Sequence, residues 1–94
     1  MSKARDPKGF LRNIAQGKLP LSNLLDCKIE YAIPMSGERV AQVIRSVTLN
    51  GSAIHINWGE YGPRLLYDGE TDTLILALDP NGPEFTIDDL VITQ

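Results

Sequence analysis

The 94-residue chain has very few of the side chains that catalytic and metal sites use most often: one cysteine, one histidine and one tryptophan. With Cys27 alone it forms no internal disulfide and no cysteine-based zinc cage, and a reducing compartment, the cytoplasm, fits best. No apolar run approaches about 18 residues, so the sequence predicts no membrane span. Its basic first residues have no apolar segment behind them, so we expect no secretory signal.

These scarcities also limit the chemistry that the chain can support. A zinc site needs at least three ligands, and His55 with Cys27 supplies only two. Cys27 falls on the apolar side of an expected strand, where cysteine behaves as a small hydrophobe rather than a nucleophile. The acidic run Asp68, Glu70, Asp72 begins like a calcium loop but lacks the closing bidentate glutamate. We therefore expect no catalytic residue, no metal and no cofactor.

Positive charge is scarce in most of the chain and concentrated at its start. Residues 1–18 carry five cations and one acid, whereas residues 19–94 carry four cations and eleven acids. From residue 60 onward, one cation stands against eight acids. The chain is thus a basic arm on an acidic body. Such an arm either folds back onto its own body or reaches a nucleic acid or an acidic partner.

The length predicts a single domain, residues 1–94. Within it, the first third of the chain predicts a short helix. We expect residues 1–6 to be disordered and residues 7–17 to form a helical arm. Asp6 can cap this helix, Pro7 suits its first turn and Gly17 can end it. Its apolar face would carry Phe10, Leu11 and Ile14.

From Cys27 onward the pattern changes to that of a β body, residues 27–94, beginning with strict alternation over residues 27–33. Residues 38–49 are ambiguous, because Val40, Val43, Ile44 and Val47 also have helical spacing. Their β-branched composition and the hairpin signal Asn50-Gly51 favour strand. The alternative is an α+β fold with residues 37–48 helical.

A two-residue turn at Asn50-Gly51 predicts the register of this hairpin. Val47 would then face Ile54, and Val43 would face Trp58. One face gathers the apolar residues Val43, Val47, Leu49, Ile54, Ile56 and Trp58, and the other carries Ile44, Ser46, Thr48, Ala53, His55 and Asn57. The partition predicts that Trp58 points inward and His55 outward.

Further strands are expected at residues 64–67 and 73–78, and residues 85–93 close the chain with a last strand at residues 90–92. Short turns rich in glycine, proline and acids separate them. The near-continuous apolar run of residues 73–78 suggests burial on both faces or a central position in a barrel. The fold class is therefore mainly β: a small antiparallel meander that closes into a five- or six-stranded barrel or roll of SH3-like size, with a short N-terminal helix.

Aromatic residues and arginine, which concentrate interface energy, gather around residues 58–67 and are followed by acids. The predicted partner-binding residues are Trp58, Glu60, Tyr61, Arg64, Tyr67, Asp68, Glu70 and Asp72. In the competing interpretation, Trp58 and Tyr67 are core residues and Tyr61 covers a sheet edge.

The sequence favours a small, acidic, non-catalytic binding module, an inhibitor, immunity or adaptor protein that occludes a basic surface of a protein partner. One alternative is a nucleic-acid accessory protein that binds through the basic arm. Another is a small-molecule-binding protein or an enzyme that uses His55.

Overall fold

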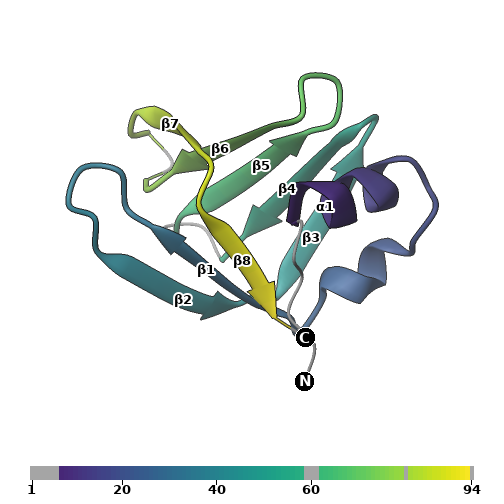
Figure 1. Cartoon of the computed structure of the whole chain (residues 1–94), viewed down its shortest axis with the longest axis horizontal. Coiled ribbons are helices and arrows are strands. Elements are labelled where there is room, and N and C mark those ends of the chain that lie inside the picture. Colours follow the sequence, from purple (N-terminus) through teal and green to yellow (C-terminus); the bar gives the residue numbers. More distant parts are fainter. Residues whose placement is uncertain (1–6, 59–61, 80, 94) are drawn as a thin grey trace.

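The computed structural model describes residues 7–58, 62–79 and 81–93 and shows one short α-helix, one 3₁₀ turn and eight strands (Figure 1). In chain order the elements are α1 (Pro7–Ala15), η1 (Leu21–Leu24), β1 (Lys28–Ala32), β2 (Arg39–Val43), β3 (Ser46–Asn50), β4 (Ala53–Asn57), β5 (Arg64–Asp68), β6 (Thr73–Ala77), β7 (Glu84–Ile87) and β8 (Leu90–Thr93).

The strands form two antiparallel sheets, β2-β1-β8 and β3-β4-β5-β6-β7. The chain passes between the sheets at two corners, each only two residues long: Ile44-Arg45 between β2 and β3, and Asp88-Asp89 between β7 and β8. The predicted mainly-β fold with a short N-terminal helix is confirmed. Strand pairing among the described residues does not connect the two sheets, so a closed barrel is not confirmed.

Residues 38–49 are extended, and the alternative in which residues 37–48 form a helix is wrong. The prediction of one continuous strand here is also wrong, because the chain turns at Ile44-Arg45 and the two halves join different sheets. Ile44 is fully buried at this corner, and its N–H donates to the carbonyl of Cys27 at 2.8 Å. Val43 is 40% exposed instead of lying inward opposite Trp58.

The β3–β4 hairpin is present, but its turn lies one residue later than predicted. Asn50 pairs with Ala53 and Leu49 with Ile54, which leaves Gly51 and Ser52 as the turn. Gly51 has a φ of 63°, the conformation that the first central residue of a type II′ turn requires. The shift moves every partner by two positions, so it leaves the side chains of β4 on their predicted faces. Two predictions for the preceding residues are wrong: Ile44, expected on the outer face, is buried, and Leu49, expected to lie inward, is 39% exposed. Ile54 and Ile56 lie inward and His55 outward, as predicted.

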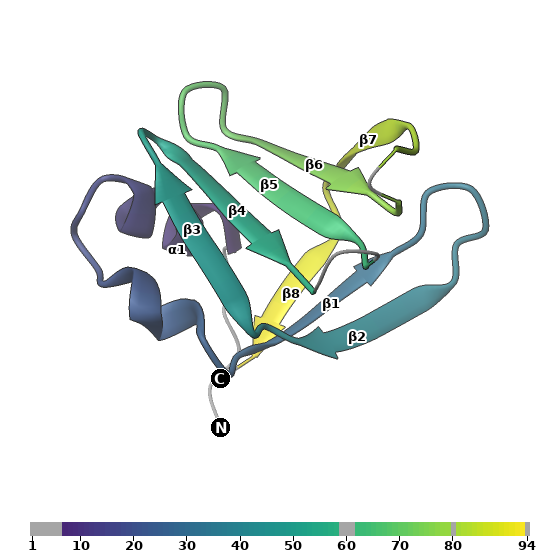
Figure 2. The same cartoon turned by 180° about the vertical axis from the view of Figure 1, so that it is seen from behind.

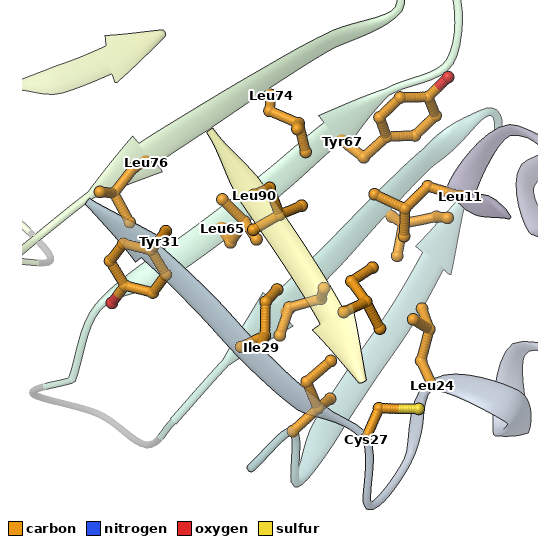
Figure 3. Packing of buried hydrophobic residues seen from close by; sticks show 14 of the residues in the cluster. Leu11, Leu24, Cys27, Ile29, Tyr31, Leu65, Tyr67, Leu74, Leu76 and Leu90 are labelled. Carbon is orange, nitrogen blue, oxygen red and sulfur yellow. The ribbon is translucent and has the colours of Figure 1, made fainter. Parts of the chain in front are cut away.

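The inner faces of the two sheets enclose one apolar core, which α1 and η1 extend at one end (Figure 3). Leu11 and Ile14 are the buried residues of α1, and Leu24 is that of η1. The helix stops where expected: Gly17 has a φ of 81°, and the N–H of Lys18 donates to the carbonyl of Asn13 at 2.8 Å. Neither described helix has the length and hydropathy to cross a bilayer.

Candidate binding surface on the outer face of the five-stranded sheet

The five-stranded sheet has two chemically different faces, because alternate residues of each strand point to opposite sides. On its inner face, the side chains of β4, β5 and β6 are at most 1% exposed: Ile54, Ile56, Leu65, Tyr67, Leu74 and Leu76. Its outer face, turned toward the viewer in Figure 2, places His55, Leu66 and Ile75 in one cross-strand row. Leu66 and Ile75 are only partly buried there.

A groove of about 560 Å³ lies on this outer face. Its apolar floor comes from Leu66, Ile75 and Ala77, and its polar rim from His55, Asn57, Arg64 and Glu84. Ala77 pairs with Arg64 on one side and with Glu84 on the other, so a short side chain separates two long charged ones. This size difference hollows the surface over Ala77. An apolar floor with few polar groups around it is the usual composition of a binding site.

The charge of the groove is asymmetric. Arg64 is exposed, its strand neighbours are the uncharged Asn57 and Ala77, and it makes no ion pair with any described residue. Glu84 lies two strands away in the same row, at about 10 Å by normal strand spacing. Arg64 is also the one cation in residues 46–87, which contain six acids.

Of the predicted partner-binding residues, Tyr67 belongs to the interior and Trp58 packs against it. Trp58 is half-buried, and its Nε1 donates to the carbonyl of Val43 at 2.8 Å, which ties the end of β4 to the other sheet. Tyr67 is fully buried and donates its hydroxyl to Asp72 at 2.6 Å. Because its side chain is not exposed, Tyr67 cannot contact a partner and is not part of the candidate surface. Tyr67 is thus a core residue, as the competing interpretation has it, whereas Trp58 is only partly buried.

Four of the other predicted residues lie on β5 or in the turn between β5 and β6. Arg64 and Asp68 lie on the outer face of β5, while Glu70 is exposed in the β5–β6 turn, where its N–H donates to the Asp68 carboxylate at 2.9 Å. Asp72 turns toward α1 and pairs with Arg12 at 3.0 Å. Glu60 and Tyr61 lie outside the described residues.

The basic helix folds back onto the acidic body, one of the two arrangements predicted for the arm. Arg12 pairs with Asp72, and Lys8 pairs with Asp88 at 3.4 Å. The hydroxyl of Tyr67, followed by Arg12, holds the pKa of Asp72 below its ordinary value. Burial, followed by the nearby Asp72, raises the pKa of Tyr67. Helix, turn and core thus share one hydrogen-bonded cluster, from Arg12 through Asp72 to Tyr67.

The structure separates the two residues that a thiol-based enzyme would need. Cys27 is buried and donates its thiol to the carbonyl of Asn23 at 3.0 Å, whereas His55 is exposed on the outer face of the other sheet. Burial, with a smaller contribution from Asp26, raises the pKa of Cys27, which keeps it a neutral thiol. Within the described ranges, no three histidine, cysteine or carboxylate side chains come together to hold a metal.

Sequence reasoning singled out His55 but missed the groove around it. The available signal was the pair of apolar runs at residues 64–67 and 73–78, which place Leu66 and Ile75 where a solvent-facing strand usually carries polar side chains. No protein-family model matches the chain, and neither curated proteins nor solved structures show a significant similarity to it. The case for function therefore depends on the geometry of this chain alone.

Proposed function

We propose that the protein is a non-catalytic binding module that occludes a basic surface of a protein partner, as an inhibitor, immunity or adaptor protein does. The contact surface in this proposal is the outer face of the five-stranded sheet. The groove floored by Leu66 and Ile75 is the observation that carries the proposal. A sheet needs only one apolar face to pack against a core. A second apolar face that stays in water costs free energy, because its surface is not buried.

The surrounding charge supports a basic partner. Asp68 and Glu84 flank the apolar floor on the outer face, and Glu70 and Asp79 stand exposed in the turns at either end of β6. Such a ring of acids steers a basic surface toward the groove and speeds its association. Trp58 and Tyr67, which the sequence offered as anchors, are replaced in this role by Leu66 and Ile75.

The alternative of nucleic-acid binding through the arm receives less support. Its helical cations Lys8 and Arg12 are already paired with carboxylates of the body, and the sheet that would receive bases is acidic. The alternative of a small-molecule site is favoured by one observation, the presence of His55 on the rim of the groove. An open groove on a sheet face nevertheless suits a protruding side chain of a protein better than an enclosed ligand.

A pull-down from the native cell tests the proposal with a matched pair of variants. Ile75→Asp places a charge on the floor of the groove, whereas Met35→Asp places the same charge at a site that is 75% exposed and does not line the groove. We expect the unaltered chain and Met35→Asp to retain the same protein, with binding that weakens as salt rises, and Ile75→Asp to lose it. Equal retention by all three chains would remove the groove from the proposal, and retention of nucleic acid would favour the arm.

A further inference from the structure

We infer that the partner surface, although basic overall, carries one carboxylate that pairs with Arg64, next to an apolar side chain that fills the hollow over Ala77. This inference rests on the proposed function and adds the chemistry that fixes the register of the complex. It concerns the row Asn57, Arg64, Ala77 and Glu84, which crosses β4, β5, β6 and β7.

The position of Arg64 carries the inference. A sheet adapted only to repel anions and attract cations has no use for an arginine at the rim of its groove. Arg64 is the one cation in residues 46–87, and it forms no ion pair within the described parts of the chain. It is therefore available to a partner, and its planar guanidinium suits two hydrogen bonds to a carboxylate.

Desolvation makes the complementary anion necessary. When a partner covers the groove, Arg64 loses water, and a covered charge without a counter-ion weakens binding strongly. The same reasoning applies at the other end of the row, where Glu84 needs a cation. Since the two charged residues are separated by two strand spacings, about 10 Å, the matching partner segment presents an acid, an apolar residue and a base in that order across the groove.

A random-peptide phage library, selected on the immobilised full chain, tests this pattern even while the partner is unidentified. Three further chains serve as baits: Ile75→Asp, with a blocked groove; Arg64→Glu, with a reversed charge; and Arg45→Glu, with the same reversal at an exposed arginine outside the groove. All three positions are at least partly exposed, and circular dichroism verifies that each bait is folded.

We expect the unaltered chain and Arg45→Glu to enrich basic peptides that contain one acid beside an apolar residue. Arg64→Glu should reduce the recovery of acid-containing peptides about tenfold or more, the usual effect of a close charge pair at an interface. Enrichment of purely basic peptides, undiminished on Arg64→Glu, would overturn the inference and leave the proposed function intact. Absence of any enrichment over the Ile75→Asp bait would overturn both.

Discussion

The inner and outer faces of the five-stranded sheet are built from alternate residues of the same strands, yet their side chains differ in burial. The inner residues Leu74 and Leu76 are at most 1% exposed, whereas Ile75 between them remains partly open to solvent. The inner face is closed by the second sheet and by α1, but nothing in the described chain covers the outer one. The comparison shows that apolar character alone does not identify a core residue; the position of the second layer decides it.

We expect the largest loss of stability from a substitution on the inner face. Tyr67→Ala removes a fully buried ring and the hydroxyl that binds Asp72. It should lower the free energy of unfolding by about 3–5 kcal/mol, as for other large-to-small core substitutions. Urea denaturation measures this loss, and Tyr67→Phe, which keeps the ring, should recover most of it. A stability of Tyr67→Ala close to that of the parent would place Tyr67 at the surface.

Trp58 tests how firmly the inner faces of the two sheets are joined. Its ring is half-buried against the core and its indole N–H donates to Val43 in the other sheet. Trp58→Ala should cost about 2 kcal/mol, from lost apolar burial and one lost hydrogen bond. The parent should also show blue-shifted tryptophan fluorescence that iodide quenches poorly. Red-shifted, freely quenched emission would make Trp58 an interface anchor again.

Gly51 controls which residues reach which face, because the turn sets the register of β3 against β4. Its φ of 63° is unfavourable for a β-branched residue. Gly51→Val should therefore lower stability by about 1 kcal/mol or more, measured as a lower melting temperature. Ser52→Val, at the second turn residue, is the matched control and should be better tolerated. Equal melting temperatures for both variants would contradict the observed turn.

The Arg12–Asp72–Tyr67 cluster ties α1 to the inner-face side of the sheet and gives stability a dependence on pH. Because the pKa of Asp72 is lowered in the folded state, its contribution is present above the unfolded carboxyl pKa and is lost as pH falls through the folded one. The pKa of Tyr67 is raised, so its contribution is lost as pH rises past the ordinary tyrosine value of about 10.

Melting temperatures recorded from neutral to acidic pH test the carboxylate part of this cluster. Asp72→Asn should show a smaller loss of stability in acid than the parent chain. Glu70→Gln, two residues away in the same turn, is the control and should follow the parent. Identical acid profiles for the parent and Asp72→Asn would show that the cluster contributes nothing.

The sequence predicted the elements better than their arrangement. Alternation and β-branched residues predicted the strands, and Pro7 and Gly17 marked the helix correctly. The corner at Ile44-Arg45 was missed because no glycine or proline marks it. Ile44 is held there by backbone hydrogen bonds with Asp26 and Cys27, which are distant in sequence. The turn was displaced because Gly51 supplies a positive φ equally well to Asn50-Gly51 and to Gly51-Ser52.

The candidate site was less predictable than the fold. Arg64 and Asp68 were identified from composition and do lie on the outer face, but Tyr67 was assigned to the surface by its residue type and is part of the core. The groove depends on pairing between β5, β6 and β7, which brings Arg64, Ala77 and Glu84 into one row. No local pattern reports such a row, since its members are separated by turns of different lengths.

Unfolding of two threonine variants at adjacent positions, Ile75→Thr and Leu76→Thr, tests the central distinction between the faces most directly. Threonine is β-branched and suits a strand at either position, so the comparison reports mainly the loss of apolar contacts. The account predicts that Leu76→Thr lowers the free energy of unfolding by about 3 kcal/mol or more, while Ile75→Thr changes it by less than about 1 kcal/mol. Equal losses would show that Ile75 is needed to hold the fold and would contradict its assignment to a free binding surface.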